Sequence, residues 1–140
     1  MRHRAAATVT ALVLCACLLL TGCSARARQR DLIRNDPMYS ATWDGIEFLG
    51  TEDSKDDGPK PPPVAMTRCF TITIPPEDAL QKVMATAEQN GWTEDRSSKS
   101  SPTRTAGKGS REGGMSLYVS TDIIRCKQHP ETNFVVSIAL

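Results

Sequence analysis

Cysteine and histidine are the residue types in this chain most able to do nucleophilic or metal chemistry, and they are few. After the first 23 of its 140 residues, the chain contains only Cys69, Cys126 and His129 of these types. A thiol nucleophile needs a histidine within hydrogen-bond reach, and one cysteine near one histidine beside a predicted turn is a weak signal. One histidine and two thiols also fall short of the four ligands of a structural zinc site. We therefore predict no catalytic residues and no metal site.

The acidic run from Glu52 to Asp57 resembles a calcium-binding loop only superficially. Counted from Asp53, the third and twelfth positions of such a loop would be Lys55 and Val64, where oxygen ligands are required. A solvated connecting segment explains the run better.

Gly107-Lys108-Gly109-Ser110 likewise fails as a phosphate-binding loop. The Gly-Lys-Ser/Thr order is missing, and the segment precedes a predicted strand instead of a helix. Residues 97–114 are rich in Ser, Gly, Thr and Lys, which predicts a mobile loop. Arg104, Lys108 and Arg111 make this loop basic, so it is a candidate contact for an anionic envelope polymer or for lipid headgroups, with a merely solubilising loop as the alternative.

The longest apolar stretch lies at the N-terminus. Met1–Arg4 is a short positive head, and Ala5–Leu20 is a sixteen-residue segment with only two weakly polar members. A charged head, a short apolar core and small residues after it are typical of an export signal, whereas a membrane-spanning helix needs about 20 apolar residues. Export is therefore expected, with an ordinary secretory signal or an uncleaved signal anchor as alternatives to the lipid attachment described next.

Leu20-Thr21-Gly22-Cys23 resembles the lipobox of bacterial lipoproteins, in which one large apolar residue and two small ones precede the modified cysteine. The resemblance implies a diacylglycerol on the Cys23 thiol, removal of residues 1–22 as a signal peptide, and a position on the extracytoplasmic face of the cell membrane. Acyl chains in pairs give stable anchoring. The chain looks like small lipoproteins of high-GC Gram-positive bacteria, a likeness that carries no activity onto the rest of the sequence.

The net charge changes little when residues 1–22 are removed. Loss of Arg2 and Arg4 reduces the 17 Lys and Arg to 15, against 16 Asp and Glu, which leaves a net charge of −1. This near balance argues against nucleic-acid binding, which needs a concentrated basic field. Four arginines follow the anchor, where each would add about 1 kcal/mol of attraction to an anionic bilayer or would simply solvate a tether: Arg26, Arg28, Arg30 and Arg34.

Residues 23–63 have the composition of a flexible tether. Glycines and the acidic run interrupt this segment, and the proline-rich stretch 59–63 favours a stiff, extended spacer. Trp43, Ile46, Phe48 and Leu49 are too apolar for a pure linker, so this cluster is expected to dock either on its own domain or on a partner.

Residues 64–140 predict a small α+β domain. Alternating apolar residues indicate a strand from Val64 to Ile74, a short edge strand near residues 92–96, and an antiparallel hairpin formed by residues 115–123 and 134–140. Between the first two strands, a helix begins at Pro75-Pro76 and ends at Asn90-Gly91. We expect two layers, with an antiparallel sheet of about four strands and this one helix on one face.

Cys69 and Cys126 remain as an even pair in an oxidising compartment, where disulfides persist. The parity of their strands directs both away from the helix-covered face, provided the 115–123 strand extends to Cys126. The thiols would then meet if the first and third predicted strands are neighbours. Closing this loop would stabilise the fold by roughly 4 kcal/mol; two free thiols are the alternative.

These observations predict a lipid-anchored extracytoplasmic protein that is not an enzyme. We expect a binding or interaction module of the cell envelope, without a cofactor other than the covalent lipid on Cys23. Its partners would be the membrane and an envelope protein or polymer. A small-ligand carrier is the second hypothesis and an envelope enzyme the third. The candidate partner surface consists of Trp43 and Phe48 in the tether and Arg104, Lys108 and Arg111 in the basic loop.

Overall fold

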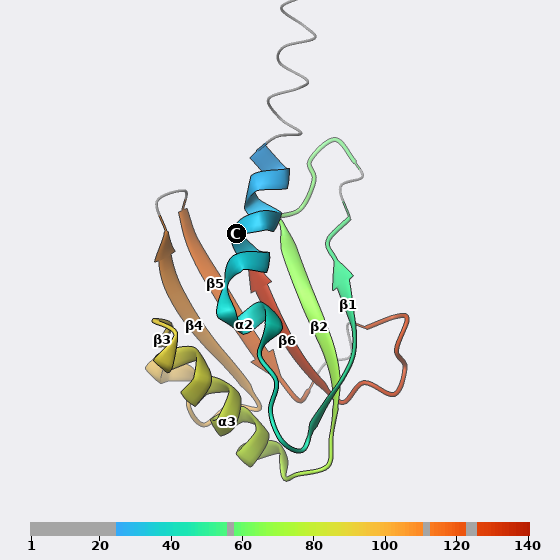
Figure 1. The fold of residues 1–140 in the computed structure, drawn as a ribbon, viewed down its shortest axis with the longest axis vertical. Helices are drawn as coiled ribbons and strands as arrows, with labels where there is room; N and C mark the ends of the chain where they lie inside the picture. The colour runs from blue at the N-terminus through green and yellow to red at the C-terminus, as the bar shows by residue number, and fades with distance from the viewer. Residues whose placement is uncertain (1–24, 56–57, 111–112, 123–125) are drawn as a thin grey trace, which may run out of the picture.

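An antiparallel sheet forms one layer of the fold, and the helices pack on a single face of it (Figure 1). The computed structural model describes residues 25–55, 58–110, 113–122 and 126–140. Within these residues the sheet has six strands in the order β1-β2-β6-β5-β4-β3, and every neighbouring pair is antiparallel. The strands are β1 (Ile46–Asp53), β2 (Ala65–Ile72), β3 (Thr93–Glu94), β4 (Thr103–Ser110), β5 (Gly113–Ser120) and β6 (Phe134–Ala139).

The α+β class is confirmed, but the sheet is larger than the four strands we expected. The alternating segments that predicted strands correspond to β2, β3, β5 and β6, and β5 and β6 pair in the expected antiparallel hairpin. Met66 and Phe70 of β2, and Leu117 of β5, point into the helix-covered core as their parity predicts. The two additional strands are β1 and β4.

The long helix α3 (Pro76–Gln89) has the expected bounds. A proline stands in its first turn, where its missing N–H has no partner to lose, and Glu77 and Asp78 lie at the positive end of the helix dipole. Gly91 ends the helix region with a φ of 83°, a conformation that glycine adopts without steric cost. The predicted apolar face is buried, as the positions of Leu80, Val83, Met84 and Ala87 show.

Strand β1 lies where we expected part of the flexible tether. It pairs with β2 from Ile46 opposite Ile72 to Asp53 opposite Met66, and a register shift between Phe48 and Gly50 interrupts the pairing. The proline-rich stretch 59–63 therefore belongs to the connection between β1 and β2 instead of separating a tether from a domain. The apolar and polar residues of β1 do not alternate regularly, because of the irregularity between Phe48 and Gly50 and the acidic residues at the end of the strand. The sequence pattern therefore did not identify it.

Strand β4 lies where we expected a mobile loop. Arg104, Ala106 and Lys108 face the helices, and of these three side chains two are charged and one is apolar. A strand with charged inward positions does not produce the apolar alternation that identifies strands in a sequence. The loop prediction for residues 97–114 is therefore wrong over Thr103–Ser110.

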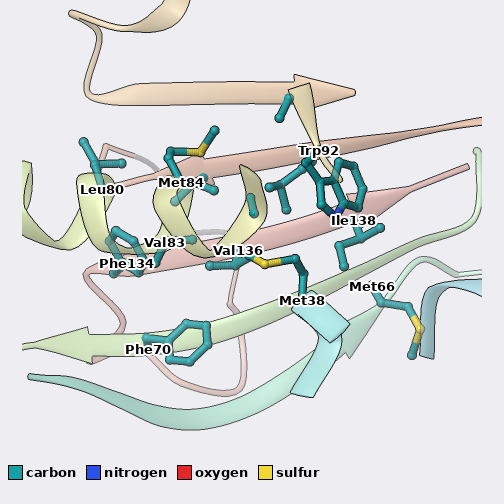
Figure 2. Packing of buried hydrophobic residues seen from close by; sticks show 14 of the residues in the cluster. Met38, Met66, Phe70, Leu80, Val83, Met84, Trp92, Phe134, Val136 and Ile138 are labelled. Atoms are coloured by element: carbon teal, nitrogen blue, oxygen red, sulfur yellow. The ribbon is translucent and has the colours of Figure 1, made fainter. Parts of the chain in front are cut away.

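Residues before the sheet also contribute to the core. Residues 25–35 are helical and are here called the stem; they lead into the one-turn helix α2 (Pro37–Ser40). Ile33 of the stem and Met38 of α2 have no exposed surface. Figure 2 shows Met38 among the core side chains that α3 and the central strands contribute. Stem, α2 and α3 thus cover the same face of the sheet (Figure 1).

Candidate functional site

The residues proposed as a partner surface do not form one surface. Cys23 and Arg111 lie outside the described residues. Trp43 and Phe48 lie beside β2, whereas Arg104 and Lys108 lie on β4 at the other side of the sheet. Each of these four side chains has neighbours that explain its position, and they are described in turn below.

Cys69 and Cys126 are joined by a disulfide that closes a sequence separation of 57 residues, with their Cα atoms 6.1 Å apart. Cys69 lies on the face of β2 opposite the helices, as its parity predicts. There the bridge packs against Val135 of β6 in a second small apolar cluster, which Leu49 and Tyr118 complete. The expected route is wrong in one respect, because β2 borders β6 and not β5. Cys126 reaches the bridge from the connection between β5 and β6.

The disulfide has consequences for the chemistry considered above. Glu52 lies close enough to both sulfurs for the three residues to have formed a metal site. The sulfurs are bonded to each other, however, and the Glu52 carboxylate accepts a hydrogen bond from the backbone N–H of Gln128 at 2.9 Å. His129 packs instead on the backbone of β1, where a Cβ at Gly50 would collide with its ring. In this state neither cysteine is a thiol nucleophile.

Asp36 and Lys108 form an ion pair between α2 and β4, with Lys108 Nζ 2.7 Å from Asp36 Oδ2. The Asp36 side chain is only 1% exposed. Its other oxygen accepts hydrogen bonds from the Met38 backbone N–H at 2.9 Å and from Trp92 Nε1 at 3.2 Å. The Lys108 ammonium also lies 5.7 Å from the centre of the Trp92 ring, within cation–π range. Lys108 is therefore engaged in the interior and is not a free basic contact.

Arg104 is engaged in a similar way between β4 and α3. Its guanidinium contacts the Glu77 carboxylate and lies 3.5 Å from Glu94 Oε1, while Lys99 Nζ lies 3.7 Å from the other oxygen of Glu94. The Arg104 side chain is 10% exposed, and its Nε is buried with no hydrogen-bond partner among the described residues. The two basic residues expected in a mobile loop thus hold β4 to the helical layer.

A third buried cation, Arg68, lies on β2 close to three aromatic rings, which come from the residues before β1, from β1 and from β2 itself. Its Nη1 donates hydrogen bonds to the backbone carbonyls of Met38 at 3.0 Å and Ala41 at 2.8 Å. The guanidinium also lies 4.9 to 5.8 Å from three ring centres, those of Phe70, Phe48 and Trp43. Burial lowers the pKa of Arg68, and the charge of Tyr39 opposes this shift. Arg68 thereby joins α2 to the sheet.

The docking of Trp43 follows from this arrangement. Its indole Nε1 donates a hydrogen bond to Thr86 Oγ1 of α3 at 2.8 Å, and its ring packs edge-on against Phe70. Docking on its own domain, one of the two outcomes we considered, is thus what the structure shows for Trp43 and Ile46. Phe48 differs, because 48% of its surface is exposed at the edge strand.

We expect Arg68→Met to lower the free energy of unfolding by about 2 kcal/mol. The substitution keeps most of the side-chain volume but leaves two carbonyl acceptors without their donor, at about 1 kcal/mol each, and it removes the cation–π contacts. Urea denaturation followed by tryptophan fluorescence measures the change. An unchanged or greater stability would show that burying the guanidinium costs more than its contacts return.

The stem is tied to the fold along its length. Arg26 Nη1 donates a hydrogen bond to the Pro62 carbonyl at 3.1 Å, which joins the start of the stem to the connection between β1 and β2. Arg34 and Asp31 form an exposed ion pair at 3.6 Å. Ile33 is buried in the core, and Asp36 follows immediately. The stem is thus a helix packed on the domain.

Two residues whose contacts hold this region together, Asp36 and Arg68, were not identified from the sequence. Asn35-Asp36-Pro37 is a turn signal in the sequence, but Asp followed by Pro also marks a helix start, with Asp as the cap and Pro in the first helical position. The sequence therefore also contained the signal for a helix start at Asp36. Arg68 interrupts the apolar parity of the strand predicted from Val64 to Ile74, and an inward charge within a clear strand indicates a buried polar contact.

Comparisons with protein-family models, with curated proteins and with solved structures found no match to this chain. The function is therefore argued from the residues and their geometry alone. Across the described ranges, no helix combines the length and the hydrophobicity that crossing a membrane requires.

Proposed function

We propose that this chain is a lipid-anchored extracytoplasmic protein that acts as a non-catalytic interaction module of the cell envelope. The observation that carries this proposal is the Cys69–Cys126 disulfide, packed in its own small cluster on the outer face of the sheet. Stable disulfides belong to oxidising compartments, which agrees with the export signal before Cys23. The lipobox-like residues 20–23 add the attachment.

The use of the charged side chains supports a role without catalysis. Asp36 with Lys108, and Glu94 with Arg104, form buried or half-buried pairs that connect α2 and β3 to β4. Catalytic acids and bases need access to a substrate, and these groups are instead committed to holding the layers together.

A small-ligand carrier is supported less well. The more apolar of two grooves along α3 has a volume of about 450 Å³ and is lined by Ile74, Ala85 and the exposed polar residues Asp78, Gln81 and Lys82. Small-molecule sites commonly bury 70–90% of their ligand. A surface groove lined mainly by exposed helix residues does not enclose a ligand in this way.

The anchor is tested by metabolic labelling with a fatty-acid probe in cells producing the wild-type protein or Cys23→Ser. We expect the wild type to be labelled and to partition with membranes, and the variant to lose both properties because the acylated sulfur is gone. Cys69→Ser serves as a matched control, since it removes a different cysteine and should leave labelling intact. Equal labelling of the wild type and Cys23→Ser would contradict the anchor.

The interaction role is tested by crosslinking on intact cells. A photoreactive phenylalanine analogue at position 48 places the probe where the wild-type ring is already 48% exposed. The same analogue at Glu88, on the exposed face of α3, is the control position. A discrete crosslinked species from position 48 and not from position 88 would assign the partner to the β1 edge. The absence of any crosslink from both positions would argue against a partner at either surface.

A further inference from the structure

Strand β1 is an open edge of the sheet. Figure 1 shows it at one side, and in the described part of the chain β2 is its sole neighbouring strand. The opposite edge is partly closed: the two-residue β3 covers part of β4, and beyond it the backbone of Thr105 is bonded to the Asp95 N–H and to Ser98 Oγ. The eight residues of β1 therefore offer the longer stretch of strand edge to a partner.

The pairing with β2 determines which backbone groups of β1 point outward. Just before the strand, the Thr73 N–H donates to the Gly45 carbonyl at 3.0 Å, and just after it the Ser54 N–H donates to the Ala65 carbonyl at 2.8 Å. In an antiparallel ladder, residues bonded to the opposite strand alternate with residues whose N–H and C=O point away from it. Counted inward from these two bonds, the outward residues are Ile46, Phe48, Thr51 and Asp53.

Three of these outward residues have backbone groups available to a partner. The Ile46 N–H already donates to the Trp43 carbonyl at 3.2 Å. Among the residues that the structure describes, the outward N–H and C=O groups of Phe48, Thr51 and Asp53 make no hydrogen bond. The Phe48 ring lies beside them and is 48% exposed. An open strand edge of this kind is the surface to which an extended segment adds as a further strand.

The charge of β1 determines what kind of segment fits. Its residues include three acidic side chains and no basic one. The Glu52 carboxylate accepts a hydrogen bond from Gln128, but Glu47 and Asp53 are exposed and have no ion-pair partner within the described ranges. A second copy added to the same edge would bring the carboxylates of two acidic strands together, which is destabilising. Charge complementarity therefore favours a basic segment over a second copy.

We propose that β1 accepts an extended, basic segment of an envelope protein as an additional strand. The segment bonds to the outward backbone groups of Phe48, Thr51 and Asp53. Its basic side chains lie beside Glu47 and Asp53, and an apolar residue covers the Phe48 ring. The irregularity between Phe48 and Gly50 divides the contact into two short stretches, so the association is reversible. This proposal rests on the interaction role proposed above and names the chemistry of the partner.

The test uses the full chain, purified in detergent micelles, and an end-blocked peptide of alternating lysine and valine with about seven residues, the length of a typical strand. Amide hydrogen exchange followed by NMR reports the contact at each residue. We expect the peptide to slow exchange at Phe48, Thr51 and Asp53, because their N–H groups acquire acceptors. The same peptide with glutamate in place of lysine should bind at least about tenfold more weakly, since it repels the acidic strand.

Two variants of β1 separate backbone pairing from charge. Thr51→Pro removes an outward N–H that β2 does not use, and its ring blocks an added strand, so peptide affinity should fall at least about tenfold. Glu47→Gln combined with Asp53→Asn should lower affinity about fivefold, because each exposed ion pair contributes about two- to threefold. The matched control, Asp78→Asn combined with Glu88→Gln, removes two exposed carboxylates from α3 and should leave affinity unchanged. Circular dichroism verifies the fold of every variant.

Slower exchange at the three outward amides, with weaker binding of both β1 variants, supports the proposal. Unchanged exchange at these amides with millimolar peptide, or equal losses in the two charge variants, would overturn it. A wild-type dimer that Thr51→Pro abolishes, measured by analytical ultracentrifugation, would show that a second copy occupies the edge instead. Crosslinking from position 48 in cells does not depend on the peptide. A crosslink without peptide binding would thus reject the added strand and retain the interaction role.

Discussion

Replacing both Cys69 and Cys126 with alanine is expected to lower the free energy of unfolding by about 4 kcal/mol. The bridge closes a loop with a sequence separation of 57 residues, and in the chain-entropy model this removes many conformations from the unfolded state. Small domains have a total stability of only about 5–15 kcal/mol, so this is a large fraction. Urea denaturation of the oxidised wild type and the double variant measures the difference.

Reduction provides an internal control for the disulfide prediction. Dithiothreitol should move the wild-type unfolding midpoint toward that of the double variant, and should leave the double variant itself unchanged. A wild type whose midpoint is insensitive to reduction would show that the bridge contributes little. Since Cys69 and Cys126 are both buried, alanine also removes some packing, and the reduced wild type separates that contribution from the covalent one.

The second large effect is expected for Asp36→Ala, which should lower the free energy of unfolding by about 4 kcal/mol. The substitution leaves the Lys108 ammonium without its partner, and breaking a buried ion pair in this way costs about 3–5 kcal/mol. It also removes the oxygen that accepts from the Met38 and Trp92 N–H groups. Urea denaturation monitored by tryptophan fluorescence reports the change, because Trp92 lies at the site.

Two variants separate the charge of Asp36 from its hydrogen bonds. Asp36→Asn keeps a side-chain oxygen for the cap and should be less destabilising than Asp36→Ala. Combining it with Lys108→Met removes both charges, and we expect a coupling energy of about 1–3 kcal/mol between the two sites. Glu88→Gln, an exposed acidic position, is the control and should change stability by less than about 0.5 kcal/mol. Additive effects of the Asp36 and Lys108 substitutions would contradict a direct pair.

The parts of the fold that the sequence predicts are those whose inward residues are mostly apolar, with Arg68 of β2 as an exception. β2, β5, β6 and the face of α3 each bury a regular series of hydrophobic side chains, and periodicity is sufficient to identify them. β4 was not predicted as a strand, because two of its inward side chains are cations. Their partners, Asp36, Glu77 and Glu94, come from other segments of the chain. Such pairs have no periodic signature, since neither residue indicates the other until the chain is folded.

In the candidate site, too, features set by local geometry could be predicted and features set by distant contacts could not. The parity of β2 correctly directed Cys69 to the face without helices, because strand geometry alone determines it. The neighbouring strand was not determined by any local feature, and β6 inserts between β2 and β5. The partner surface was least predictable, because exposure of Arg104, Lys108 and Trp43 depends on contacts with α2 and α3.

The central position of β6 has a consequence for how the chain matures. In sequence order β6 follows every other strand, yet it is the sole link between the β1–β2 pair and the β5–β4–β3 group. A nascent polypeptide that ends before Phe134 can form only two disconnected sheet fragments, so the hydrophobic layer cannot close during most of synthesis. Assembly of the complete sheet is therefore deferred until β6 has been synthesised.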